Sequence, residues 1–96
     1  MEENPGTQAV ITVLGKDRVG IIAEVCTYLS KREINILDIS QTIRQGFFNM
    51  LMIVEMPHAD SDAFSAAASG LEALGETMGL EIRLRHADIF NAMHRI

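Results

Sequence analysis

The order of hydrophobic and polar positions along the chain predicts six elements: strand, helix, strand, strand, helix, strand. Residues 9–14 are β-branched or apolar on both faces, which is typical of a central strand. Residues 19–32 repeat apolar side chains at helical spacing, and Asp17 is a candidate cap for this helix. Residues 47–56 carry apolar side chains on both faces and end at Pro57, which cannot donate to a strand ladder.

The segment at residues 34–45 predicts a half-exposed strand, because its polarity alternates with a period of two. One side carries the apolar residues Leu37, Ile39 and Ile43, interrupted by Gln41, and the other side carries the polar residues Asp38, Ser40, Thr42 and Arg44. Gln45 and Gly46 mark a tight turn, so this strand should form a hairpin with the strand at 47–56.

A second helix is predicted from Asp60 or Ser61, either of which could cap it, to Gly79 just past its end. Its apolar stripe consists of Phe64, Ala67, Ala68, Leu71, Leu74 and Met78. Gly70 and Gly75 weaken this helix, and Gly75 could end it early. Residues 80–85 alternate as a final strand, and the spacing of Ile89, Phe90, Met93 and Ile96 predicts a short C-terminal helix.

This order predicts an α+β fold, the ferredoxin-like βαββαβ sandwich, with both helices on one face of an antiparallel sheet. We expect residues 1–8 to form a flexible tail and residues 9–96 to form a single domain that includes the terminal helix. The first and third strands should be central. The open face of the sheet would then carry Phe47, Leu51 and Ile53. We expect another subunit or the terminal helix to cover it, although scattered surface hydrophobic residues are the alternative.

Composition narrows the class of partner. The chain has 96 residues and a net charge of -5, which disfavours nucleic acid and anionic membranes as partners. Cys26 is the single cysteine, so no internal disulfide can form. The first eight residues do not resemble a signal peptide, and no apolar run reaches the ~20 residues of a membrane helix. We therefore expect a cytoplasmic protein.

Residues 15–25, Gly-Lys-Asp-Arg-Val-Gly-Ile-Ile-Ala-Glu-Val, closely resemble the opening of ACT domains, which often read Asp-Arg-Pro-Gly-Ile. Val19 replaces the common proline. Residues 34–39 resemble the second ACT signature, and the Phe47-Phe48 pair with its Met-rich strand resembles the third strand of this family. The chain is similar above all to small stand-alone single-ACT prokaryotic proteins. It also resembles the N-terminal ACT domain of formyltetrahydrofolate deformylase and ACT proteins of the glycine-cleavage repressor type.

The residues suggest how an amino acid could bind. Gly20 opens the N-terminus of the first helix, where a carboxylate is favoured. Asp17 could face an amino group, and Asn35 offers both donors and an acceptor. The resemblance places Asn35 near the same loop, often across a subunit interface, and implies a ligand site that consists of Asp17, Arg18, Val19, Gly20, Ile21, Ile22, Asn35 and Ile36. Alternatively, Asp17 only caps the helix, Gly20 only permits close packing, and Asn35 is a turn residue.

The sequence gives little support for a metal site, a cofactor or an enzymatic activity. Cys26 lies on an apolar helical stripe, and His58, His86 and His94 lack metal-ligand spacing, so we expect no metal and no cofactor. The acylphosphatase pattern is not matched, since Arg18 is the only arginine of its loop and Asp17 adjoins it. We expect a non-enzymatic regulatory ACT protein that binds a small molecule as a homo-oligomer, a dimer or higher, and acts through an unidentified protein partner. The alternatives are a ligand-free interaction adaptor and, less favoured, an acylphosphatase-like hydrolase.

Overall fold

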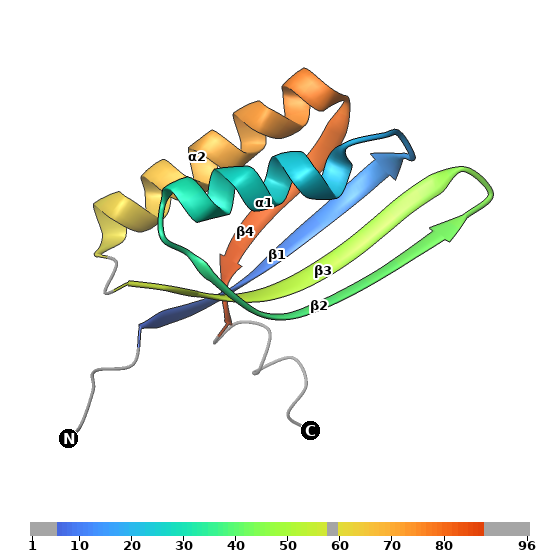
Figure 1. Cartoon of the computed structure of the whole chain (residues 1–96). Coiled ribbons are helices and arrows are strands. Elements are labelled where there is room, and N and C mark those ends of the chain that lie inside the picture. Colours follow the sequence, from blue (N-terminus) through green and yellow to red (C-terminus); the bar gives the residue numbers. More distant parts are fainter. Residues whose placement is uncertain (1–5, 58–59, 88–96) are drawn as a thin grey trace.

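The predicted order of elements is confirmed. The computed structural model describes residues 6–57 and 60–87. Its elements are β1 (Thr7–Lys16), α1 (Ile21–Lys31), β2 (Asn35–Arg44), β3 (Phe47–Met56), α2 (Ser61–Met78) and β4 (Leu80–His86) (Figure 1). β1 begins two residues before the predicted start. The predicted C-terminal helix, His58 and His94 lie outside the described residues.

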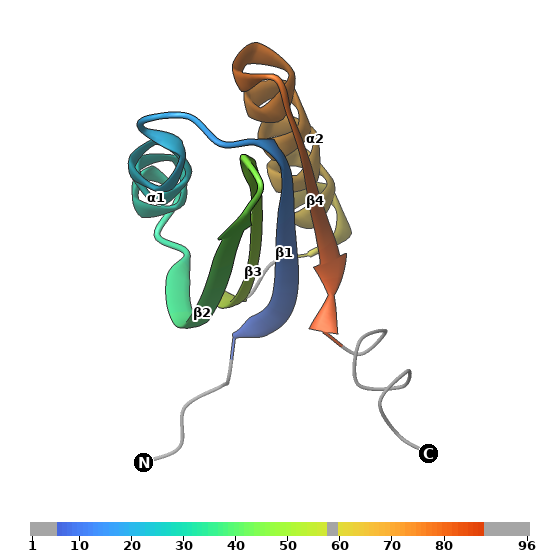
Figure 2. The same cartoon turned by 90° about the vertical axis from the view of Figure 1, so that its right-hand side faces the viewer.

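The four strands form one antiparallel sheet in the order β2-β3-β1-β4. β1 and β3 are central, as their apolar character on both faces predicts. Both helices cover the same face, with α1 over the half of the sheet that contains β2 and β3, and α2 over the half that contains β4 (Figure 2). This is the ferredoxin-like sandwich expected from the sequence.

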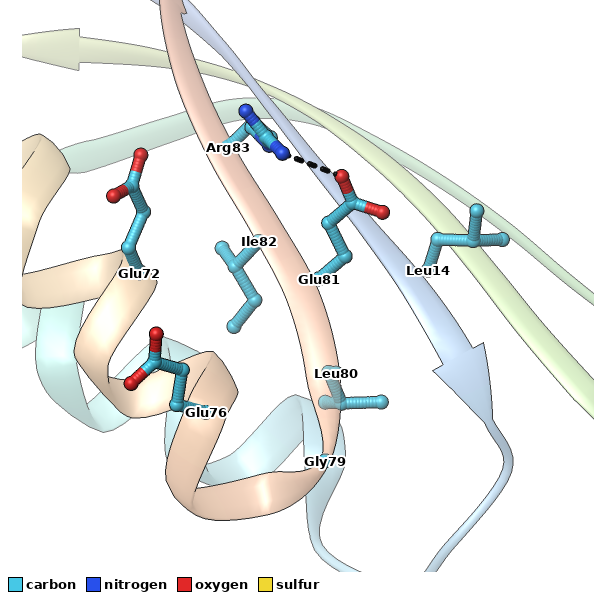
Figure 3. Close-up of a pocket in the computed structure, with 8 residues that line it drawn as sticks. All are labelled: Leu14, Glu72, Glu76, Gly79, Leu80, Glu81, Ile82 and Arg83. Atoms are coloured by element: carbon cyan, nitrogen blue, oxygen red, sulfur yellow. Dashed lines mark hydrogen bonds and ion pairs between the residues drawn. The ribbon is translucent and has the colours of Figure 1, made fainter.

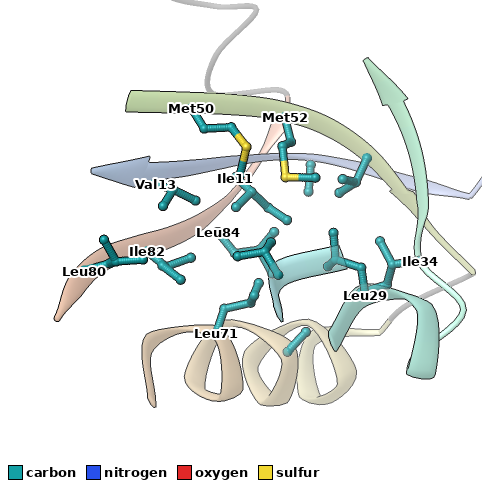
Figure 4. Close-up of a cluster of buried hydrophobic side chains, with 14 of the residues drawn as sticks. Ile11, Val13, Leu29, Ile34, Met50, Met52, Leu71, Leu80, Ile82 and Leu84 are labelled. Carbon is teal, nitrogen blue, oxygen red and sulfur yellow. The ribbon is translucent and has the colours of Figure 1, made fainter. Parts of the chain in front are cut away.

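The hydrophobic core lies between the sheet and the two helices (Figure 4). Ile11 and Val13 of β1 and Met50 and Met52 of β3 are buried there almost completely. From the helices, the core receives Ile21, Val25, Leu29, Ala67, Leu71 and Met78. The two central strands therefore hold the core on one face and leave their other side chains on the open face.

The ends of α2 follow the sequence signals, but the start of α1 does not. The Asp60 carboxylate accepts a hydrogen bond from the backbone N–H of Ala63 (2.8 Å), and Gly79 ends α2 in a left-handed conformation with φ 73°. The prediction that Asp17 caps α1 is wrong. The N-cap position is Gly20, and no side chain of the described residues caps this helix.

Gly70 and Gly75 do not interrupt α2, which continues through both to Met78. A Cβ at Gly70 would overlap the hydroxyl of Tyr28, which donates to the carbonyl oxygen of Ala67 (3.3 Å). A Cβ at Gly75 would lie 2.7 Å from the carbonyl oxygen of Leu80. Both glycines therefore let α2 approach its neighbours closely, and this packing outweighs their low helix propensity.

The prediction that β2 is half-buried is wrong. Every residue of β2 after Ile36 is exposed, and Ile39 and Ile43 keep 42% and 55% of their surface in solvent. Ile39 pairs with the buried Met52, so the two side chains share the helix-covered side of the sheet. β2 is an edge strand, however, and the helices bury one face of the neighbouring β3 but not the β2 side chains after Ile36. A bulge between Ile36 and Asp38 also breaks its register.

The open face of the sheet carries the residues that the sequence places there. Phe47, Leu51 and Ile53 alternate with the buried methionines of β3, and Phe47 is 57% exposed. Leu14 of β1 is exposed on the same face. Whether a subunit or the terminal segment covers this face stays a prediction.

Candidate functional site

The β1–α1 loop presents an open helix N-terminus. Gly20 has φ 92°, and a Cβ built on it would meet no atom within 4 Å. Its carbonyl oxygen accepts from the N–H of Glu24 (2.9 Å), which begins the helical ladder. The backbone N–H groups of the first turn precede that ladder and carry the positive end of the helix dipole. This geometry suits the carboxylate of a small ligand.

Two hydrogen bonds hold the loop in place. The N–H of Asp17 donates to the carbonyl oxygen of Gly46 in the β2–β3 turn (2.8 Å). The Arg18 guanidinium donates to the carbonyl oxygen of Met78 at the end of α2 (3.4 Å). The only arginine of the loop is therefore directed at α2. Val19, in contrast, is 93% exposed.

Ile21 and Ile22 occupy different environments. The Ile21 side chain is 2% exposed and belongs to the core, so only its backbone could reach a ligand. Ile22 lies at the surface of α1. Of the predicted loop residues, Asp17, Arg18, Val19 and Ile22 are exposed and Gly20 is half-buried, while Ile21 supplies an N–H at most.

Asn35 and Ile36 lie at the other end of α1 from Gly20 (Figure 1). The 11 residues of α1 span about 16 Å. One chain therefore holds the predicted residues as two groups, one at each end of this helix, and does not bring them together.

A groove of about 540 Å³ surrounds the Asn35 group, lined by Cys26, Leu29, Ser30, Glu33, Ile34, Asn35 and Ile36. Glu33 is a residue that the sequence analysis missed. It directly follows the C-cap residue Arg32, has φ 58°, and its N–H donates to the carbonyl oxygen of Ser30 (3.0 Å). The available signal was a helix that stops without a glycine or asparagine at the position that usually needs one.

A second cavity, of about 450 Å³, lies between α2 and β4 (Figure 3). Glu72 and Glu76 line it from α2, and Arg83 pairs with Glu81 at 2.7 Å on β4. It contains none of the predicted site residues. Across residues 6–57 and 60–87, no three metal-ligating side chains gather, and neither helix is long and apolar enough to cross a membrane.

Comparison with known proteins gives one consistent family. The model described as "ACT domain" matches residues 7–85. A UPF0237 protein of Bifidobacterium longum is 56% identical over 89 residues, which cover 93% of this chain and 98% of the relative. An ACT domain protein from Streptococcus pneumoniae superposes with a TM-score of 0.78 at 35% identity, covering 88% of this chain and 94% of that chain.

Two larger proteins contain a similar unit. A candidate glycine cleavage system transcriptional repressor matches with a TM-score of 0.71 at 25% identity, over 82% of this chain and 44% of that chain. A formyltetrahydrofolate deformylase from Pseudomonas putida matches with a TM-score of 0.71 at 18% identity, over 81% and 28%, which shows the shared fold alone. The resemblances predicted from the sequence are confirmed.

Proposed function

Since the chain belongs to the ACT domain family, we propose that it is a non-enzymatic regulatory protein that binds an amino acid between two copies of itself. The observation that carries this proposal is the separation of Gly20 and Asn35 by the length of α1. Each group is half of a site for a zwitterion, and a second copy is needed to join the halves. The absence of disulfide-forming cysteine pairs in the sequence fits a cytoplasmic setting.

The β2 edge supports self-association. Most of the large hydrophobic side chains that are exposed in the described chain lie on β2, on α1 or in the loop before it: Val19, Ile22, Leu37, Ile39 and Ile43. α1 lies over the same half of the sheet as β2 (Figure 2). An edge strand also has backbone N–H and C=O groups free to pair. A second β2 strand would satisfy those groups and cover the apolar side chains.

Antiparallel pairing of two β2 strands would assemble the complete site. With a two-fold axis at the middle of β2, Asn35 of one copy lies beside Arg44 of the other. Arg44 leads into the turn whose Gly46 carbonyl oxygen binds the N–H of Asp17. The β1–α1 loop of one copy therefore approaches Asn35 of the other copy. The two-fold symmetry produces this arrangement twice.

The chemistry of the two halves is complementary to an amino acid. The N–H groups at the start of α1 suit the carboxylate. Asp17 and Asn35 offer acceptor oxygens for the amino group, and Asn35 also offers an N–H donor. Ligand bound at this junction would stabilise the paired state, and a protein partner would respond to that state.

The first experiment screens the full-length protein by thermal shift against individual L-amino acids, because a ligand of the folded state raises the melting temperature. The variant Gly20→Gln should lose the shift by blocking the helix tip. Gly79→Gln is the matched control, since Gly79 also has a positive φ and an open Cβ position. A shift that survives Gly20→Gln contradicts the site, and the lack of any shift with the unaltered protein contradicts amino-acid binding.

The second experiment measures self-association by sedimentation velocity. Ile39→Asp should dissociate the oligomer, because it places charges along the pairing edge. Leu14→Asp is the control, since Leu14 is an equally exposed apolar side chain on the open face. If Leu14→Asp dissociates the oligomer and Ile39→Asp does not, the β2 interface is wrong. A strictly monomeric protein contradicts the whole proposal.

A further inference from the structure

Glu33 combines an unfavourable backbone conformation with a position in a ligand-sized groove. Its φ of 58° lies in the left-handed region, where a residue with a Cβ is disfavoured and glycine is the usual choice. The groove that it lines has a volume of about 540 Å³, within the range of small-molecule sites of about 300–1,000 Å³. This chain carries a glutamate at a position where glycine would be easier, and the groove offers a function for its side chain.

The groove is lined by both polar and apolar residues. Glu33, Ser30 and Asn35 supply a carboxylate, a hydroxyl and an amide, while Cys26 and Ile36 supply apolar surface. This combination matches a ligand with an amino group and a small hydrocarbon part, since such a site needs a few polar groups that fix orientation within an apolar lining.

No cation of the described chain neutralises Glu33. The guanidinium of the neighbouring C-cap residue Arg32 lies 4.1 Å from the centre of the Tyr28 ring of α1, in a cation–π contact. The ion pair of the described residues, Arg83 with Glu81, lies on β4 at the other edge of the sheet. The Glu33 carboxylate is therefore available to a cationic group that enters the groove.

We propose that Glu33 binds the ammonium group of the ligand across the subunit junction and selects amino acids over carboxylic acids that lack an amino group. The inference rests on the proposed function and makes it more specific. The α1 tip of one copy, with its uncapped N–H groups, binds the carboxylate. Glu33 of the other copy binds the ammonium. A ligand without an ammonium leaves Glu33 unpaired and brings its own negative charge toward it, so dicarboxylates and simple acids are rejected.

The test uses isothermal titration calorimetry on the full chain. The probes are the L-amino acid that gives the largest thermal shift and the carboxylic acid with the same carbon skeleton but no amino group. The unaltered protein should bind the amino acid and not its deaminated counterpart. Glu33→Gln keeps the size of the side chain and removes its charge. It should lower the amino-acid affinity about tenfold or more and abolish the preference for the amino acid.

Glu72→Gln is the matched control, because Glu72 lines the separate cavity between α2 and β4. Asp17→Asn is tested beside it, because Asp17 is the other carboxylate assigned to the amino group. If Asp17→Asn abolishes the preference and Glu33→Gln leaves it intact, Glu33 is not the selector, while the proposed amino-acid binding stands. If the unaltered protein binds no amino acid, the proposed function itself fails. Sedimentation velocity on Glu33→Gln should show an unchanged oligomer, and dissociation would overturn the assignment of Glu33 to the ligand.

Discussion

Replacing Glu33 by glycine is expected to stabilise the free protein and to weaken its ligand binding. The gain comes from the backbone, since a residue with a Cβ in the left-handed region costs about 1–2 kcal/mol. Part of this gain, about 0.4–1 kcal/mol, is lost again, because glycine raises the conformational entropy of the unfolded chain. The net stabilisation should be about 0.5–1 kcal/mol. Removing a negative charge from the C-terminal end of α1 acts in the same direction.

This net gain corresponds to a rise in melting temperature of roughly 2–8 °C for a domain of this size. The assay is urea unfolding followed by circular dichroism, without ligand and at one fixed protein concentration, because association alters apparent stability. Gln45→Gly is the first control. Gln45 has φ 54° in the β2–β3 turn, so it should give a similar gain without loss of ligand discrimination. Glu33→Gln is the second control. It should give only the smaller gain from the lost charge, because the residue with the left-handed backbone still carries a Cβ.

The outcomes separate conformational strain from a structural role of the side chain. If Gln45→Gly raises the urea midpoint and Glu33→Gly lowers it, the Glu33 side chain stabilises the folded chain, and its backbone conformation is no sign of a role in ligand binding. If both variants raise the midpoint and only Glu33→Gly loses amino-acid discrimination, Glu33 lowers the stability of the folded chain and is required for ligand selection.

Three further variants test the packing that positions the site, each by its urea midpoint. Gly75→Ala should destabilise the protein by about 1–3 kcal/mol despite better helix propensity, because the new Cβ would lie 2.7 Å from the carbonyl oxygen of Leu80. A stability gain would contradict this contact. Asp60→Ala should cost about 1 kcal/mol through loss of the cap on the N–H of Ala63, and no change would argue against that bond. Leu71→Ala should cost about 2–5 kcal/mol, since Leu71 is fully buried, and a cost below about 1 kcal/mol would contradict its place in the core.

The sequence predicted the central strands and α2 well because their signals are local. β1 and β3 are apolar on both faces, and such a pattern is typical of a central strand. Asp60 and Gly79 mark the ends of α2 through backbone chemistry that depends on few neighbours. The exposure of β2 could not be predicted in this way. Its alternation is real, but burial depends on how far the helices extend over the edge of the sheet.

The candidate site was predicted in part for the same reason. Gly20 could be assigned to an open helix N-terminus, because a glycine at the start of an apolar helical stripe can be recognised from its sequence neighbours alone. Glu33 was harder to identify, since its residue type gives no sign of a left-handed backbone and the only signal was a helix end without glycine or asparagine. Its place in the groove with Asn35 appears only in the folded chain. The distance between Gly20 and Asn35 likewise follows from how the helix leads from one end of the sheet to the other.

That distance has a thermodynamic consequence for the proposed sensor. If the ligand bridges Gly20 of one copy and Glu33 of another, a monomer offers only half of the contacts, so binding and association are linked. Ligand at a hundredfold excess over its dissociation constant then stabilises the paired state by about 2.7 kcal/mol for each of its two sites. By reciprocity, dilution of the protein must weaken apparent ligand affinity. A titration repeated across protein concentrations that span the dissociation of the pair tests this directly, and an affinity independent of protein concentration would place the whole site within one chain.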